Sequence, residues 1–152
     1  IELAAKYKFL HQEDFGLDVA FFPRLILPTS SNPALGSKHV ALFLPFYAQK
    51  DWGEWSIFGG GGCTLSRGET SEDSCQMGIA ATRQISPHLQ LGVELYHQTP
   101  DGRGARQTTG VGVGAIYDLS DNLHLMASAG PGIQNADATN QASWYVAVLF
   151  TY

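Results

Sequence analysis

Large apolar side chains recur at every second position along most of this chain. The last ten residues, SWYVAVLFTY, place Trp144, Val146, Val148, Phe150 and Tyr152 on one side. Successive side chains of an extended strand point to opposite faces, so a period of two predicts a strand with one apolar face. The tail is therefore predicted to be a strand, and the same pattern recurs in the segments before it.

Nine segments of strand length alternate with turn signals. Their ranges are 1–9, 15–27, 40–48, 55–65, 75–83, 89–97, 111–117, 123–131 and 143–152. The connections at 11–14, 50–54, 85–88 and 119–122 are short, whereas those at 30–38, 66–74, 99–107 and 134–142 are long and polar. Short turns at one end and long loops at the other are typical of an outer-membrane β-barrel.

The two faces of these segments differ in both polarity and side-chain size. One face holds Leu, Val, Ile, Phe and Trp residues with a single formal charge, Arg83. The opposite face holds the charged residues Glu2, Lys6, Lys8, Asp18, Arg24, Glu94 and Asp118 and the glycines 78, 92, 110, 112, 114, 130 and 132. A barrel with the bulky apolar face outside and the glycine-rich polar face inside suits a lipid environment. A soluble lipocalin-like or avidin-like cup would need the reverse arrangement.

Aromatic residues divide into two predicted groups. An interfacial girdle is expected at strand ends beside the short turns, formed by Tyr7, Phe9, Phe15, Phe46, Trp55, Tyr117, Phe150 and Tyr152. A solute pathway through the lumen is expected to be lined by Asp18, Phe22, Arg24, Phe43, Tyr47, Glu94, Tyr96, Asp118, Met126 and Tyr145. Rings beside a few polar groups suit a small aromatic solute, although packing of the interior explains the same residues equally well.

The fold predicted from these patterns is all-β: an antiparallel up-and-down transmembrane β-barrel in the bacterial outer membrane, with residues 1–152 as one domain. Bacterial single-chain barrels have even strand numbers and both chain ends on the short-turn side. The first of the nine segments instead starts on the long-loop side. This parity favours a larger, even-numbered barrel of which residues 1–152 are the C-terminal portion, with N-terminal strands missing before Ile1.

Charge and cysteine content narrow the function classes. A formal net charge of −5 argues against a nucleic-acid partner, which a basic patch would attract. Cys63 and Cys75 flank the polar stretch SRGETSEDS, and a disulfide across a hairpin loop is favoured over a metal site or a redox pair, which would need more ligands or closer spacing. Such a disulfide implies an oxidising compartment, which includes the bacterial periplasm and cell surface.

Residues 94–132, ELYHQTPDGRGARQTTGVGVGAIYDLSDNLHLMASAGPG, resemble the outer-membrane transporter family named after the MetA pathway of phenol degradation. The shared features are His97 to Asp101, a Gly/Arg-rich loop, Gly114 to Asp118 and Ser120 to Asn122. LPTSSNPALGSK and KYKFL extend the resemblance over nearly the whole chain, while Pro131 departs from the arginine typical of the family. The resemblance implies an outer-membrane barrel whose partners are membrane lipid, the barrel-assembly machinery that reads a C-terminal aromatic strand, and a solute.

The predicted function is a passive channel or uptake protein, not an enzyme, for small hydrophobic or aromatic compounds. Neither a cofactor nor a metal site is expected, because the five histidines lack ligand spacing and GVGVGA misses the dinucleotide-binding pattern. One alternative is a lipid-A or phospholipid hydrolase that uses His97 and Thr99 on the lipid-facing side. The other is a structural barrel with a plugged interior.

Overall fold

The computed structural model describes residues 1–29, 39–66 and 72–151. Its strands are β1 (Glu2–Ala4), β2 (Tyr7–Leu10), β3 (Asp18–Phe21), β4 (Arg24–Ile26), β5 (Ala41–Trp52), β6 (Trp55–Ser66), β7 (Ser74–Ser86), β8 (Leu89–Gln98), β9 (Thr108–Ser120), β10 (Leu123–Gln134) and β11 (Ala142–Phe150). Two short helices, α1 (Gln12–Phe15) and the 3₁₀ turn η2 (Ala136–Ala138), lie in connections. No helix within the described ranges is long and apolar enough to cross a bilayer.

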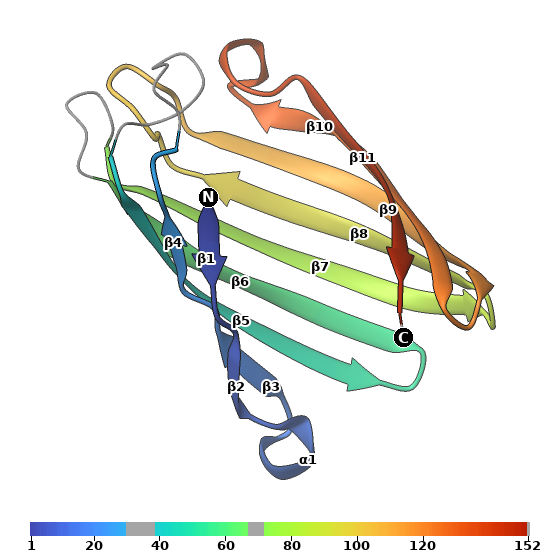
Figure 1. The fold of residues 1–152 in the computed structure, drawn as a ribbon. Helices are drawn as coiled ribbons and strands as arrows, with labels where there is room; N and C mark the ends of the chain where they lie inside the picture. The colour runs from blue at the N-terminus through green and yellow to red at the C-terminus, as the bar shows by residue number, and fades with distance from the viewer. Residues whose placement is uncertain (30–38, 67–71, 152) are drawn as a thin grey trace.

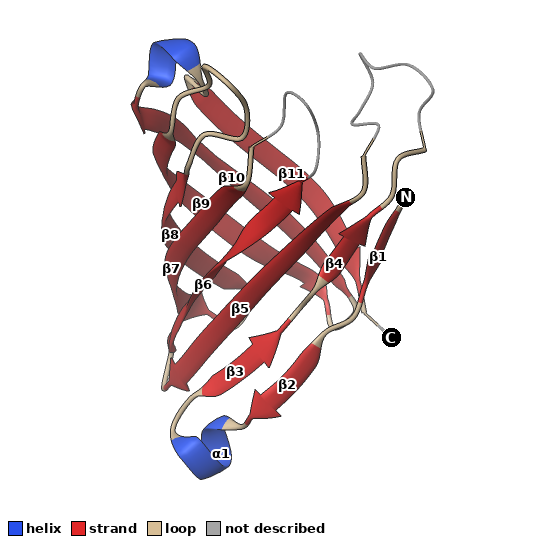
Figure 2. Ribbon diagram, turned by 90° about the vertical axis from the view of Figure 1, so that its left-hand side faces the viewer, coloured by secondary structure: helices blue, strands red, loops and turns tan. Residues whose placement is uncertain are grey.

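All eleven strands belong to one antiparallel sheet (Figure 1). From β5 to β11 each strand pairs with the next along the chain, while β3 and β4 both pair with β5 and in turn carry β2 and β1. The prediction of an all-β, up-and-down antiparallel fold is thereby confirmed. The sheet curls strongly, as Figure 2 shows, but the predicted closure into a barrel is not formed: β1 and β11 are not paired with each other. These residues therefore form an open, curved sheet with two free edges.

The two edges run in the same direction. Eight antiparallel steps lead from β1 through β4 and β5 to β11, and an even number of reversals restores the starting direction (Figure 1). A direct β1–β11 pair would therefore be parallel. Fully antiparallel closure of this sheet requires an odd number of further strands between the edges, which agrees with the parity of the nine predicted segments.

The first two predicted segments are each divided into two short strands. β1 and β2 pair with β4 and β3 respectively, so the hairpin is kept but interrupted between Ala4 and Tyr7 and between Phe21 and Arg24. Pro23 lies at this break and has no N–H to donate to a ladder. Its carbonyl still accepts a hydrogen bond of 3.2 Å from the amide of Ala5, which holds the two halves together.

Three of the short turns contain two residues each, at 53–54, 87–88 and 121–122. β5 continues to Trp52, beyond the predicted end at residue 48, and Trp52 pairs directly with Trp55 across the turn. Gly53 has φ of 55°, in the left-handed region that two-residue hairpins use and glycine adopts without strain. The predicted turn at 11–14 is occupied by α1, and the long connection at 30–38 lies outside the described residues.

Strand register confirms the predicted sorting of faces. Across β6, β7, β8 and β9, one row joins Ile57, Ala81, Val93 and Val113, and the neighbouring row joins Phe58, Ala80, Glu94 and Gly112. Because paired residues in neighbouring strands point to the same side, the first row lies on the apolar face and the second on the polar face.

The apolar face is exposed over most of its area. Trp144 is 80% exposed, Val113 64% and Val93 58%, whereas burial of large side chains is confined to a few positions such as Phe43. The sequence predicted one charged side chain on this face, but the described strands place two there. Lys50 joins Arg83 there because β5 extends to Trp52, and both lie near short turns.

The predicted Cys63–Cys75 disulfide is present. The two residues are paired directly across β6 and β7, with their Cα atoms 4.0 Å apart, on the apolar face of the sheet. Disulfides persist in oxidising compartments, so the bond indicates an extracytoplasmic location.

Glycines on the polar face allow neighbouring strands to approach closely. A Cβ atom added to Gly130 would contact the carbonyl oxygen of Val111 and lie 2.6 Å from the Cα of Gly112. Both are backbone atoms, which cannot move without distorting the ladder. At Gly78, by contrast, the nearest atom would be the Leu95 carbonyl oxygen at 3.4 Å, an ordinary contact distance.

We predict that Gly130→Ala lowers the free energy of unfolding by about 1–3 kcal/mol, the usual cost of overpacking. Gly78→Ala is the matched control, on the same face, and is expected to change stability by less than about 1 kcal/mol. Equilibrium unfolding in urea, followed by tryptophan fluorescence, measures both. Equal stabilities of the two variants would show that the close approach at Gly130 is not present in the folded protein.

Candidate functional site

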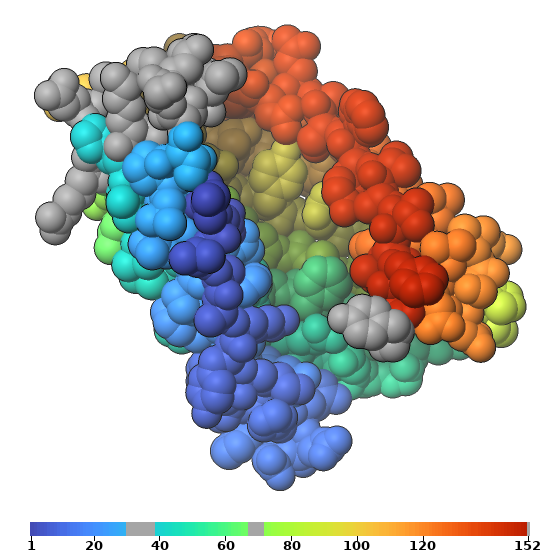
Figure 3. Space-filling model, viewed as in Figure 1, coloured from blue at the N-terminus to red at the C-terminus, as the bar shows by residue number. Residues whose placement is uncertain are grey.

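The polar face lines a hollow between the N-terminal and C-terminal strands. Figure 3 shows this hollow, bordered by the blue strands on one side and the red strand β11 on the other. Two adjoining cavities of about 190 and 380 Å³ lie along it, and Phe58, Ala80 and Glu94 line both. We call this surface the concave face, and it is the candidate functional site.

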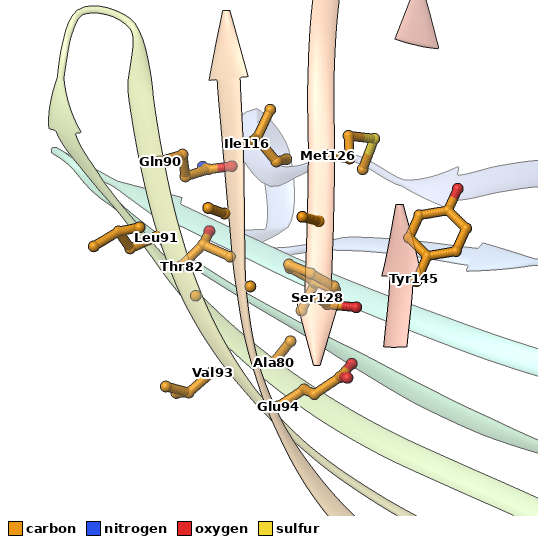
Figure 4. Close-up of a pocket in the computed structure, with 15 residues that line it drawn as sticks. Ala80, Thr82, Gln90, Leu91, Val93, Glu94, Ile116, Met126, Ser128 and Tyr145 are labelled. Atoms are coloured by element: carbon orange, nitrogen blue, oxygen red, sulfur yellow. The ribbon is translucent and has the colours of Figure 1, made fainter. Parts of the chain in front are cut away.

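The smaller cavity lies over β7 to β11. Figure 4 shows Glu94, Gln90 and Met126 on the cavity side of the strands, with Tyr145 at the far wall, whereas Leu91 and Val93 point away. Its polar groups come from Thr82, Gln90, Glu94, Ser128 and Tyr145, and its apolar groups from Phe58, Ile116 and Met126. Both kinds of group converge on one space, which suits a small amphipathic ligand.

The larger cavity is lined by aromatic rings that alternate with glycine. Tyr47 pairs with Gly60, Gly60 with Gly78, Gly78 with Tyr96, and Tyr96 with Gly110. A Cβ atom at Gly110 would contact the ring of Tyr96, so the ring occupies the space above that glycine. The glycines thus provide room for the rings to lie across the sheet and leave open space beside them.

Most charges on the concave face are held by partners. Lys8 Nζ lies 3.2 Å from Asp18 Oδ1, which also accepts a hydrogen bond of 2.8 Å from the amide of Gln12. His124 Nδ1 lies 2.6 Å from Asp118 Oδ1. These contacts fix the carboxylates in place on the sheet.

Arg24 is held between two rings and a carboxylate. Its guanidinium carbon lies 4.8 Å from the centre of the Phe22 ring and 5.5 Å from that of Phe43, within the range of a cation–π contact. Its Nη1 atom donates to Glu2 Oε1 at 3.4 Å. Phe43 is only 4% exposed, so this cluster packs the N-terminal part of the concave face.

Glu94 differs from these groups. Among the described residues, none forms an ion pair or a side-chain hydrogen bond with its carboxylate, and the side chain is exposed to the hollow. It leans over Gly112, where an added Cβ would lie 2.5 Å from Oε1 and 2.9 Å from Cγ. Glu94 therefore presents an accessible negative charge in the middle of the concave face.

The ten predicted pathway residues all lie on the strands or breaks of this face, but they do not form one group. Six line the two adjoining cavities: Phe43, Tyr47, Glu94, Tyr96, Met126 and Tyr145. Arg24 packs against the rings of Phe22 and Phe43, and Asp118 pairs with His124. Asp18 lines a further hollow of about 540 Å³ with Lys6 and Lys8, and this hollow shares Tyr47, Phe58 and Gly59 with the larger cavity. Their role in solute passage remains a prediction.

Some lining residues were not among the predicted pathway positions. Thr82, Gln90 and Ser128 are small or polar, but their positions in the period-two pattern place them on this face and could have identified them. Asn140 had no such signal, since it lies in the long connection after η2. Its side-chain amide donates to the Tyr96 hydroxyl at 3.2 Å, a contact that only the folded loop creates.

The predicted girdle contains a contiguous aromatic cluster on the apolar face. Ring centres of Tyr7 and Phe9, and of Phe9 and Phe46, are 6.4 Å apart, and those of Phe21 and Phe46 are 4.7 Å apart. Phe46 was predicted beside a short turn, which is wrong, because β5 extends six residues beyond it to Trp52. Phe21 in this cluster and Trp52 beside its turn were not among the predicted positions, and the girdle itself stays a prediction. Tyr152 lies outside the described residues, whereas Phe15, Trp55, Tyr117 and Phe150 are exposed.

His97 does not pair with Thr99. The Thr99 hydroxyl accepts a hydrogen bond of 2.8 Å from the Cys75 amide. His97 Nδ1 instead lies 2.8 Å from Thr109 Oγ1, whose hydroxyl donates to Gln134 Oε1 at 2.7 Å. The Nδ1 atom of His97 and the hydroxyl of Thr99 are thus each engaged with a different partner rather than with each other.

No group of three or more His, Cys, Asp or Glu side chains is gathered as metal ligands would be within residues 1–29, 39–66 and 72–151. The two adjoining cavities present aromatic rings, small polar groups and the carboxylate of Glu94.

Comparison with protein-family models gives one match, over residues 1–150, to the family described as "Putative MetA-pathway of phenol degradation". No curated protein matches the chain.

We predict that Phe43→Ala lowers the free energy of unfolding by about 3–5 kcal/mol, because a buried ring is lost and a void remains beside Arg24. Phe58→Ala is the matched control on the same face: its side chain is 43% exposed, so the loss is expected to be smaller by at least about 1 kcal/mol. Urea unfolding curves of the two variants measure the difference. Similar losses would contradict the packing of Phe43 against Arg24.

Proposed function

The chain belongs to this phenol-degradation family, and we propose that it forms an outer-membrane channel through which small hydrophobic or aromatic compounds diffuse. The outer face of the curved sheet contacts lipid, and the concave face lines the pathway. The observation that carries this proposal is the inverted distribution of polarity: the exposed convex face is the apolar one.

The apolar face supports a lipid environment in two ways. Large side chains such as Val93, Val113 and Trp144 have no protein covering them, and in water such an area would be an aggregation-prone patch. Lys50 and Arg83, the charged side chains on the described strands of this face, lie near the short turns, where headgroups begin. Arg83 is further neutralised by Glu54, 3.1 Å away.

Strand length supports the same proposal. β5, β6 and β10 have 12 residues each, β7 and β9 have 13, β8 has 10 and β11 has 9. A tilted strand needs about 9–11 residues to cross the hydrocarbon core of a bilayer. Each of these seven strands is therefore long enough to span it.

The free edges of the sheet must be paired with other strands when the protein lies in a membrane. An unpaired row of N–H and C=O groups is not tolerated in hydrocarbon, so the edges at β1, β2 and β11 are paired when the protein is in a bilayer. The parallel direction of the two edges means that an odd number of intervening strands gives an even-stranded, fully antiparallel barrel.

Transport is passive in this proposal. A solute moves down its concentration gradient along the concave face, where the rings of Tyr47, Phe58 and Tyr96 contact its apolar part. Polar groups such as Gln90 and Glu94 set its selectivity. The hydrolase alternative is disfavoured by the hydrogen bonds of His97 and Thr99. We propose that the protein is not an enzyme.

The channel is tested with the protein extracted from outer membranes and reconstituted into liposomes. Faster mobility of the unboiled than of the boiled protein on a detergent gel first establishes a closed barrel. Osmotic swelling in benzyl alcohol and phenol is then expected to exceed that of protein-free liposomes. A heat-modifiable protein that admits no solute would support the plugged barrel instead, and release of fatty acid from the lipid, lost in His97→Ala, would support the hydrolase.

We predict that Val93→Arg lowers the free energy of unfolding in bilayers by about 2–4 kcal/mol if Val93 lies near the bilayer midplane, because a charge then faces lipid. Gln90→Arg, on the same strand but facing the cavity, is the matched control and is expected to change stability by less than about 1 kcal/mol. Urea titration in liposomes, read by the fast-running gel band, measures both. A harmless Val93→Arg would contradict the lipid-facing assignment.

A further inference from the structure

We infer that Glu94 makes the concave face a recognition site for small aromatic cations, such as a protonated arylalkylamine. This inference rests on the proposed channel function and names the class of solute that the channel prefers. It starts from the one carboxylate that the described strands β6 to β10 leave without a salt-bridge partner, since Asp118 on the same face contacts His124.

The position of Glu94 keeps its charge accessible. On either side its row contains the small residues Ala80 and Gly112, so no neighbouring side chain covers the carboxylate from the adjacent strands. Glycine at 112 leaves room for this arrangement, because a Cβ there would lie 2.5 Å from Oε1 and the carboxylate would have to shift. Glu94 also lines both adjoining cavities, so a solute moving between them passes its carboxylate.

Aromatic rings line the same two cavities as this charge. Phe58 lies two strands away in the same row and lines both cavities, and Tyr96 is the next residue along β8 on the same face. Tyr145 forms the opposite wall of the smaller cavity in Figure 4. A ring of a solute can contact these side chains while its ammonium group contacts Glu94, and the faces of the same rings attract the cation.

The basic groups of the concave face lie elsewhere. Lys6 and Lys8 line the further hollow toward the N-terminal strands, which meets the larger cavity at Tyr47 and Phe58, and Lys8 is paired there with Asp18. Arg24 is enclosed by Phe22, Phe43 and Glu2. Among the described residues that line the two adjoining cavities, Glu94 is the one formally charged side chain, so their lining carries negative charge, which favours a cation and disfavours an aromatic carboxylate.

The test compares three solutes of similar shape: benzylamine, benzyl alcohol and benzoate, at pH 7.5 in liposomes containing the reconstituted protein. The wild type is expected to admit benzylamine faster than benzyl alcohol and benzoate slowest. Glu94→Gln is expected to lower the ratio of amine to alcohol flux by roughly two- to fivefold, the range for an exposed ion pair. Glu94→Asp, which keeps the charge, is expected to retain most of the preference.

Glu13→Gln is the matched control, because it removes the same charge from α1, outside both cavities, and is expected to leave the flux ratio unchanged. Heat-modifiable gel mobility verifies that each variant is folded. An unchanged ratio in Glu94→Gln, or preferred entry of benzoate, would overturn the inference while benzyl alcohol entry still supports the channel.

Failure of the channel itself gives a different result, in which the wild type admits none of the three solutes. Binding of benzylamine to the detergent-solubilised protein, measured by saturation-transfer NMR, then decides whether the recognition site exists. Binding that is lost in Glu94→Gln and kept in Glu13→Gln would support the site without transport. Equal signals from all three proteins would overturn it.

Discussion

The antiparallel ladder of backbone hydrogen bonds is the constraint on which the rest of the structure depends. It forces successive side chains to opposite faces and locks neighbouring strands in register, so that one misplaced residue would move a whole strand's apolar side chains to the polar face. The rows through Val93 and Glu94 show how strictly the sequence obeys this rule from β6 to β9. The same ladder leaves unpaired groups at β1 and β11, which makes closure of the sheet a requirement wherever water is absent.

Glycine and aromatic residues on the concave face are two parts of one packing arrangement. Tyr96 lies between Gly78 and Gly110, and Tyr47 lies beside Gly60, so each ring occupies space that its neighbours leave empty. Strong curvature brings inward-pointing side chains close together, and small residues in alternate positions relieve that crowding. The result is a surface with rings, open space and, at Glu94, a carboxylate without an ion-pair partner among the described residues, rather than a filled core. Burial of a large ring is confined to places such as Phe43, where Arg24 and Phe22 pack against it.

The convex face is apolar and exposed, and the disulfide lies on this face. Cys63 and Cys75 join β6 to β7 near the long-loop end, while Trp52 and Trp55 meet at a short turn on the other end. Between them lie Ala, Val, Leu and Ile residues with no protein cover. In the channel that we propose, the sheet separates two environments, and the side chains on each face are matched to one of them. The extracytoplasmic location that the disulfide indicates is consistent with such a boundary.

The sequence by itself determined the strands β5 to β11, the two faces, the alternation of short and long connections, and the disulfide. These follow from the two-residue period and from turn residues, both of which are local properties of the chain. The division of the first two segments at Pro23 had a visible signal, since proline cannot donate to a ladder, but the extension of β5 to Trp52 did not. Only the tertiary structure decided which carboxylates have a hydrogen-bonding or ion-pair partner and which remain accessible, because Asp18, Asp118 and Glu94 look alike in a strand pattern. Their differences depend on partners such as Lys8, His124 and Gly112, which lie on other strands and are brought near by register and curvature.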